Sequence, residues 1–180
     1  MSQVYEALKK LEADRAASTG RATALDAIRV QQFVDLQREL LLAAGQSNDL
    51  PDRLVHGVAT FLGVPGAALG LVQGQSYRLL ATYGAGYEDR SRHDRAALGE
   101  CDLAPALTRG HPVVRQHRVD GETIMREVVL PFNGEVTGAL HLAFPEGASV
   151  PEEKVSLARV LAGLVGIALA NARTSSDRLR

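Results

Sequence analysis

Two apolar runs meet at an Asn-Gly pair in the segment LPFNGEVTGALHLAFP, residues 130–145. Asn133 and Gly134 both tolerate a positive φ, so we expect a two-residue turn between antiparallel strands. On the second strand the even-numbered residues of 136–144 point to one face and the odd-numbered residues to the other. Neither face is strongly polar, which predicts a central hairpin with a covering layer on each side.

A strip of apolar residues also runs along the first predicted helix. Val4, Leu8 and Leu11 share one helical face of residues 2–17, with charged residues elsewhere, and a Ser-Thr-Gly sequence then interrupts the pattern. Such a helix is stable only when another surface receives its apolar strip. We therefore expect residues 1–20 to form an amphipathic helix and linker that contacts either a protein partner or the chain's own domain.

A second helix, with a wider apolar surface, is predicted over residues 24–44. Its apolar positions include Phe33, Leu36 and Leu40, and Gly45 ends it. A helix that packs both on its own sheet and on a second helix needs such a wide surface. This segment is therefore either part of a dimer bundle or a helix buried more deeply within one chain.

Cap and turn residues mark the next elements. Asp49 is placed to cap a third helix that has Pro51 in its first turn and ends at Gly63. Residues 65–72 and 77–83 read as the two strands of a first hairpin.

Residues 84–123 form a long segment in which only a short helix near 102–109 and a strand at 112–116 are expected. Long irregular segments in compact domains are often binding loops. Six arginines lie in this one, and arginine suits capture of carboxylate, phosphate or nitrate. Acidic residues share the segment, so the arginines either hold an anion or neutralise their neighbours. The candidate ligand-pocket residues are Arg92, His93, Arg95, Cys101, Arg109 and Arg115.

Small residues recur at every fourth position in the last predicted helix, which starts with the capping box Ser149-Val-Pro-Glu152 and reaches about residue 175. One face of this helix is therefore nearly flat, and another element approaches it closely. The sheet is the favoured neighbour and a second copy of the helix is the other. For dimerisation or helix packing, the candidate residues are Phe33, Leu36, Leu40, Ala162, Gly166 and Ala170.

Composition narrows the classes of function. The chain has 20 basic and 21 acidic residues, so no overall field favours nucleic acid. Cys101 is the only cysteine, which excludes an intrachain disulfide and indicates the cytoplasm. The longest uncharged apolar run, residues 160–170, is about half of a membrane span. The histidines of the long segment match no tight ligand spacing, so no metal site is expected.

The order of these elements resembles the GAF domain family. The matching segments are LPDRLVHGVATFLGVPGAALGLV, ALTRGHPVVRQ, VVLPFNGEVTGALHLAF and IALANAR, within about residues 30–173. The resemblance implies an α+β domain over residues 24–176 with a central antiparallel sheet of about six strands. Terminal helices would pack on one face of the sheet, and loops with short helices on the other.

The resemblance also implies a regulatory role. GAF domains often dimerise through their terminal helices and close their loops over a small molecule, and so control another protein. We therefore expect a cytoplasmic, bacterial sensory module that forms a homodimer. The alternative is a scaffold that dimerises without a ligand, and a small enzyme is a more distant one.

Several chemistries of the family need residues that this chain lacks. Bilin-binding members use a cysteine commonly followed by histidine, whereas Asp102 follows Cys101. Members that reduce free methionine sulfoxide use several cysteines. Cyclic-nucleotide-binding members carry an Asn-Lys signature, and no Asn-Lys pair occurs in the sequence. Bilin and cyclic nucleotide are thus disfavoured, and the ligand stays unknown.

One histidine stands apart from the others. His141 lies between Ala139 and Ala143 on the predicted central strand, where a polar ring needs a hydrogen-bond partner. It is either a satisfied core histidine, which we favour, or a pocket group. The sequence shows no Ser-His-Asp order, phosphate-binding glycine loop or paired carboxylates, so we expect no enzymatic activity.

Overall fold

The computed structural model describes residues 31, 34–36, 38, 49–87, 96–99, 102–119 and 122–178. Two units divide the chain, Met1–Leu36 and Gln37–Arg180. The described residues of the first unit are helical, and the side chain of Gln31 donates to Asp35 Oδ1 at 2.9 Å. The predicted helix at 2–17 lies outside the described residues, as does most of the helix predicted at 24–44.

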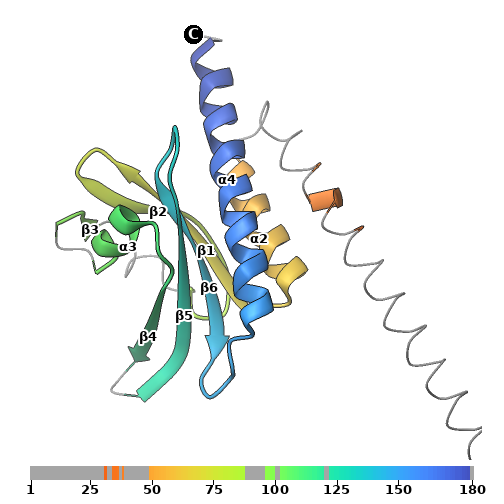
Figure 1. Ribbon diagram of the computed structural model, residues 1–180, viewed down its shortest axis with the longest axis vertical. Helices are drawn as coiled ribbons and strands as arrows, with labels where there is room; N and C mark the ends of the chain where they lie inside the picture. Colours follow the sequence, from red (N-terminus) through yellow and green to blue (C-terminus); the bar gives the residue numbers. More distant parts are fainter. Residues whose placement is uncertain are drawn as a thin grey trace, which may run out of the picture. The chain divides into compact units, whose positions relative to one another are not determined.

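An antiparallel sheet and its helices make up the second unit (Figure 1). The sheet order is β3-β2-β1-β6-β5-β4, with every neighbouring pair antiparallel. The predicted α+β class is confirmed. The long strands are β1 (Gly66–Gln73), β2 (Ser76–Gly84), β4 (Val113–Val119), β5 (Glu122–Phe132) and β6 (Gly138–Pro145), and β3 (Ala96–Ala97) adds two residues at one edge. The helices are α2 (Leu50–Leu62), α3 (Ala104–Arg109) and α4 (Glu152–Arg178).

The two faces of the sheet have different coverings. Figure 1 shows α2 and α4 on one face, here called the helix side, and α3 on the other, here called the loop side. On the helix side, the ring of Phe132 lies against Gly166 of α4. On the loop side, Leu103 and Leu107 pack in one apolar cluster with Val129 of the sheet. The sheet is thus buried on both faces, as the apolar character of the central strands predicts.

The ends of α2 follow the predicted cap residues. Pro51 lies in the first turn, and Gly63 ends the helix with a left-handed φ of 59°. Asp49 is the N-cap residue, as predicted, but its carboxylate makes no capping hydrogen bond. Its main-chain oxygen accepts a hydrogen bond from the N–H of Arg53 at 3.0 Å. The ring of His56 stacks on Tyr83 of β2, with centroids 4.6 Å apart, and this contact helps to hold α2 on the sheet.

The central hairpin has a longer turn than the sequence predicts. Phe132 pairs with Gly138, so five residues, 133–137, connect the strands instead of two. A Cβ atom at residue 138 would overlap the main-chain oxygen of Gly70 in β1 and would lie 2.7 Å from the Phe132 ring, so glycine is the residue that fits there. Strand β6 therefore begins at Gly138, packed between β1 and β5, and the Asn-Gly pair lies within the longer connection that precedes it. From Gly138 onward the predicted alternation is confirmed, with Leu140 and Leu142 on the face opposite to Ala139 and His141.

The remaining elements confirm the predicted order. In the first hairpin Gln73 pairs with Ser76 across a turn in which Gly74 has a φ of 62°. The long segment contains α3 and β4 close to their predicted positions, at Ala104–Arg109 and Val113–Val119.

Helix α4 is more apolar over its length than the uncharged run alone indicates. By length and composition, Glu152–Thr174 could cross a membrane, although 39% of its most apolar stretch is buried inside the fold. Core helices of soluble proteins have the same features, and α4 packs on β5 and α2. The apolar composition of α4 is therefore only weak evidence for a membrane span.

Candidate functional site

Polar side chains from separate parts of the chain meet on the loop side of the sheet. Glu127 on β5 and His141 on β6 are only 1% and 3% exposed. They lie together with Tyr77 on β2, Tyr87 just beyond β2, and Arg115 on β4. We call these five residues the Glu127 cluster.

The carboxylate of Glu127 is the centre of the cluster. Its Oε1 atom accepts a hydrogen bond from the hydroxyl of Tyr87 at 2.8 Å and lies 2.9 Å from Nδ1 of His141. Its Oε2 atom accepts a bond from Nε of Arg115 at 3.1 Å. A buried carboxylate needs partners of this kind, because burial without them disfavours the charged form strongly.

The positions of the protons follow from these contacts. A carboxylate only accepts, so Nδ1 of His141 carries a proton and donates it to Glu127. On the other side of the ring, Nε2 lies 2.5 Å from the hydroxyl of Tyr77. With a neutral ring, Tyr77 donates to Nε2, and the order Tyr77, His141, Glu127 forms a short relay of hydrogen bonds.

Burial also changes the acidity of Tyr87. The side chain is 3% exposed. Desolvation raises the pKa of Tyr87 well above 10.0, and the nearby charge of Glu127 raises it further. Arg115 acts in the opposite direction on the same pKa, which is consistent with its place beside the carboxylate. Tyr87 therefore remains a proton donor to Glu127 at neutral pH.

Strand register explains why these residues meet. Arg115 pairs directly with Glu127 across β4 and β5, so both side chains leave the sheet on the same face. His141 pairs with Val129, which places it diagonally beside Glu127. Tyr77 reaches the cluster across Gly70, where a Cβ atom would overlap the Tyr77 hydroxyl. Gly70 thus leaves the space that the tyrosine occupies.

Apolar side chains fill the space around the cluster. Tyr77, Tyr87, Leu103, Leu107 and Met125 belong to one buried group on the loop side. All of them are less than 10% exposed, and Tyr77 is 4% exposed. Among the described residues, this region is therefore a packed core with a polar centre rather than an open pocket.

The predicted pocket residues do not all fall within the described residues. Arg115 belongs to the Glu127 cluster, and Arg109 is exposed on α3. The other four candidates, Arg92, His93, Arg95 and Cys101, lie outside the described residues. His141 is buried and hydrogen-bonded, as expected of a satisfied core histidine.

The small residues of α4 lie on the sheet. Ala162 and Ala170 are buried, and a Cβ at Gly166 would approach Cδ2 of Phe132 to 2.8 Å. The sheet is therefore the close neighbour that the flat helical face requires. Of the other predicted packing residues, Leu36 is buried, whereas Phe33 and Leu40 lie outside the described residues.

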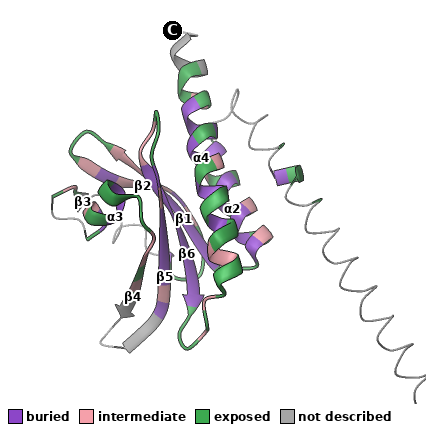
Figure 2. Cartoon of the chain, viewed as in Figure 1, coloured by how far each residue is buried: buried purple, intermediate pink, exposed green. Residues whose placement is uncertain are grey.

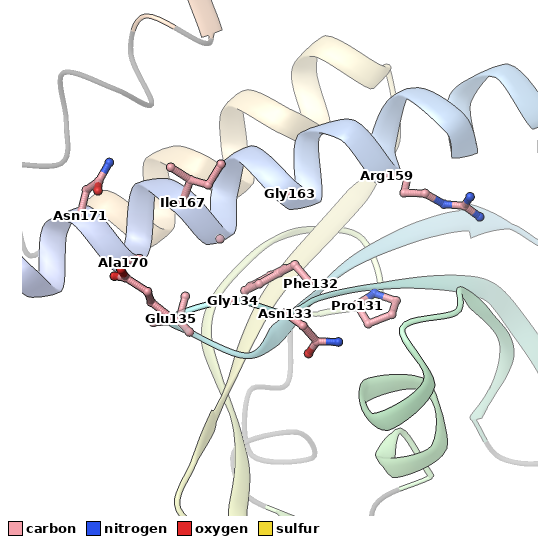
Figure 3. A pocket seen from close by; sticks show the side chains of 12 residues that line it. Pro131, Phe132, Asn133, Gly134, Glu135, Arg159, Gly163, Ile167, Ala170 and Asn171 are labelled. Atoms are coloured by element: carbon pink, nitrogen blue, oxygen red, sulfur yellow. The ribbon is translucent and has the colours of Figure 1, made fainter.

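A groove of about 340 Å³ runs between α4 and the turn of the central hairpin (Figure 3). Figure 3 shows the Phe132 side chain between the hairpin and the helix. The groove is lined by residues 131–136 of the hairpin and by Arg159, Gly163, Gly166, Ile167, Ala170 and Asn171 of α4. A second hollow, of about 550 Å³, lies nearby between the first hairpin turn and α4, and Leu169 and Arg173 contribute to its wall.

The described residues contain no group of three or more histidine, cysteine, aspartate or glutamate side chains that could hold a metal ion. The Glu127 cluster offers one carboxylate and one imidazole, and both are already hydrogen-bonded to protein groups. Its chemistry is therefore that of hydrogen bonding and charge.

Sequence reasoning missed three members of this cluster, Glu127, Tyr77 and Tyr87. One signal was present, because Glu127 is a charged residue on the same strand face as the apolar residues Met125 and Val129. The tyrosines gave no such signal, since Tyr77 lies 64 positions and Tyr87 40 positions from its partner.

Comparison with known proteins supports the fold. The GAF domain of an Acinetobacter phosphoenolpyruvate-protein phosphotransferase is 21% identical, with a TM-score of 0.60 over 78% of this chain and 94% of that one. The GAF domain of a putative sensor histidine kinase from Pseudomonas syringae pv. tomato is 19% identical, with a TM-score of 0.64 over 89% and 97%. A free methionine-R-sulfoxide reductase from Neisseria meningitidis, solved with its substrate, is 15% identical, with a TM-score of 0.57 over 78% and 89%.

The comparison with curated proteins gives no match. The sequence profile of the GAF domain matches residues 47–170, which is more than half of the chain and includes the sheet, α3 and most of α4. The chain belongs to the GAF domain family.

Proposed function

We propose that this chain is a regulatory module that self-associates through α4 and binds a small molecule on the loop side, so that binding alters the packing of its helices. The observation that carries this proposal is a strip of exposed apolar residues along α4. Similar folds occur in sensor proteins, including the GAF domain of the putative sensor histidine kinase. As an analogy of fold alone, this context supports a regulatory role.

The strip lies on the face of α4 that points away from the sheet. Val160 and Ile167 are each 54% exposed, Leu157 is 36% exposed, and Leu164 is half-buried between them. The spacing of three and four residues places all four side chains on one line, as in a coiled-coil seam. Exposed residues follow this outer face in Figure 2. A second copy of α4 is the covering partner that we propose.

The heptad positions of the residues in the strip favour a bundle of more than two helices over a two-helix coiled coil. Leu157, Leu164 and Asn171 occupy the first core position of successive heptads, and Val160 and Ile167 occupy the second. Leucine at the first position with isoleucine at the second shifts the preference from two helices to a larger bundle. Two copies supply four helices if each contributes α4 and the helix predicted at 24–44.

The groove beside the strip supports the same proposal. Ile167 belongs to the exposed apolar strip and also lines the groove, so the strip continues into the groove beside Phe132. Side chains of one helix fit into grooves of another when helices pack. A side chain of the second copy is the occupant that we propose for this groove.

Sedimentation equilibrium at micromolar concentration tests the proposal. The wild-type chain is expected to have the mass of a dimer, and Val160→Asp with Ile167→Asp is expected to give a monomer, because paired carboxylates cannot be buried in an apolar seam. Val114→Asp is the matched control, since Val114 is 59% exposed on β4. A monomeric wild-type chain, or equal loss of the dimer in the control, would contradict self-association through α4.

A scaffold without a ligand is the second candidate, and the packed loop side favours it. Tyr77, Leu107 and Met125 occupy space that a sensor would leave for its ligand. Native mass spectrometry of protein purified from cell extract distinguishes the two, together with thermal shift against small anions, nucleotides and amino acids. A co-purifying mass or a rise in melting temperature indicates a sensor, because binding to the native state alone stabilises it. A clean apo dimer without any response indicates a scaffold.

Two further parts of the proposal concern the cellular setting. The single cysteine supports a cytoplasmic location. The apolar strip of residues 2–17 supports binding of a protein partner through the N-terminal helix. Co-purification of partners with the full chain and with a variant lacking residues 1–20 tests the second point, and unchanged partner binding by the truncated variant would contradict it.

A catalytic role is the most distant alternative. The Tyr77, His141 and Glu127 relay has the form of an acid–base chain, but its terminal hydroxyl belongs to a side chain that is 4% exposed. A reacting group must come within hydrogen-bond distance of the proton that it receives or gives. The burial of Tyr77 therefore supports a structural use of the relay.

A further inference from the structure

We propose that Arg115 is an anion-binding residue at the rim of the loop side, and that it takes a ligand carrying a carboxylate or phosphate group. This inference rests on the ligand-binding part of the proposed function and names the chemical class of that ligand. The interior of the loop side is filled by packed side chains. A ligand must therefore bind at its edge, where Arg115 lies on the outermost long strand, β4.

The buried carboxylate of Glu127 holds the side chain of Arg115 in one orientation. Its Nε atom donates to Oε2 of Glu127 at 3.1 Å, and that carboxylate is itself fixed through Oε1 by Tyr87 and His141. Glu127 is buried within the sheet, so it forms a rigid base for the guanidinium. An arginine fixed in this way loses little side-chain entropy when it binds a second anion.

The outer part of the same guanidinium remains available. Within the described part of the chain, Arg115 makes its hydrogen bond through Nε, and its two terminal nitrogens make none. A purely structural arginine–carboxylate pair often uses two parallel bonds, whereas this pair uses one. The side chain is 24% exposed, which allows solvent and solutes to reach it. The geometry of two adjacent N–H donors matches the two oxygens of a carboxylate or phosphate group.

Such a ligand would be linked to the rest of the loop side through Glu127. Arg115 bonds to Oε2 and Tyr87 bonds to Oε1 of the same carboxylate. Tyr87 is the last described residue before the segment 88–95. An anion bound to Arg115 would compete with Glu127 for the positive charge of the guanidinium. It would thereby change the hydrogen bond between Glu127 and Tyr87, the residue that precedes this segment.

Isothermal titration calorimetry and thermal shift test this inference, with inorganic phosphate and sodium succinate as separate probes at constant chloride and ionic strength. The wild-type chain is expected to bind one or both probes saturably in the millimolar range, on the order of what two charge-assisted hydrogen bonds provide. Arg115→Gln is expected to weaken binding by about tenfold or more. Arg115→Lys keeps the positive charge but lacks the two adjacent N–H donors of the guanidinium. Its affinity for the probes is therefore expected to lie between those of the wild-type chain and Arg115→Gln.

Arg126→Gln is the matched control, because Arg126 neighbours Glu127 on β5 but points to the opposite face of the sheet. It is expected to bind like the wild-type chain. Absence of saturable binding of either probe to the wild-type chain would overturn the inference, as would equal weakening in Arg115→Gln and Arg126→Gln. The dimer mass measured on the same samples shows whether self-association, the other part of the proposed function, stands independently.

Discussion

Nδ1 of His141 lies 2.9 Å from Oε1 of Glu127, and both side chains are almost fully buried on neighbouring central strands. Tyr87 and Arg115 complete the set of donors around the same carboxylate. The loop side of this GAF domain is therefore organised around one buried negative charge. Removal of any donor leaves part of that charge without compensation, which makes the cluster sensitive to single substitutions.

Glu127→Gln is expected to destabilise the fold by about 3 kcal/mol, because it leaves the guanidinium of Arg115 without its buried counter-charge. The midpoint of urea unfolding, monitored by circular dichroism, measures the change. Glu135→Gln is the matched control, since Glu135 is exposed in the turn after β5, and its effect is expected to be within about 0.5 kcal/mol. Equal stability of the two variants would show that the cluster contributes little.

Tyr87→Phe is expected to change both the size and the pH dependence of stability. At neutral pH it removes a hydrogen bond to a charged group, at a cost of about 1.5–3 kcal/mol. The raised pKa of Tyr87 means that the folded chain keeps the phenol proton above pH 10.0, where the unfolded chain loses it. The stability from this proton is complete below pH 10.0 and decreases as the pH rises toward the folded-state pKa.

The wild-type chain should therefore lose stability in alkali more steeply than Tyr87→Phe, by up to about 1.4 kcal/mol per pH unit. Urea unfolding at a series of pH values from neutral to alkaline measures both slopes. If stability falls equally steeply with pH in the two proteins, Tyr87 has the same pKa in the folded and unfolded states, which would contradict this prediction.

Two glycines of α4 provide a matched pair of substitutions. A Cβ at Gly166 would lie 2.8 Å from Cδ2 of Phe132, whereas a Cβ at Gly163 would meet nothing within 4 Å. We expect Gly166→Ala to destabilise the domain by about 1–3 kcal/mol through overpacking. Gly163→Ala should instead stabilise it by up to about 1 kcal/mol, because alanine favours a helix. Melting temperatures that shift in the same direction would contradict this account of how α4 packs.

Local patterns in the sequence were sufficient for most of the fold. The alternation along 138–144 places the residues of β6 correctly, and Pro51 and Gly63 mark the two ends of α2. These features depend on neighbours that are close in sequence, which is why a single sequence reveals them. The small residues of α4 similarly indicate a close neighbour, and Phe132 provides it.

Features that depend on distant residues were not predictable. The turn after β5 is longer than an Asn-Gly pair suggests, and β6 begins at Gly138, where a side chain would overlap the main chain of Gly70 in the distant strand β1. The Glu127 cluster joins residues from β2, β4, β5 and β6, and no local spacing relates them. Arg115 was named as a candidate for its residue type, but only the fold shows which carboxylate holds it.

The most direct test of the central claim is cross-linking between two copies of α4. The variants Val160→Cys and Ile167→Cys are each made in a Cys101→Ser background. Each variant alone, and a mixture of the two, is treated with a short bis-maleimide. Val114→Cys in the same background is the control. The proposed self-association predicts a covalent dimer from the α4 variants and none from Val114→Cys, whose position lies on β4. Absence of a dimer from the α4 variants, or an equal yield from Val114→Cys, would contradict the claim that α4 of one copy faces α4 of another.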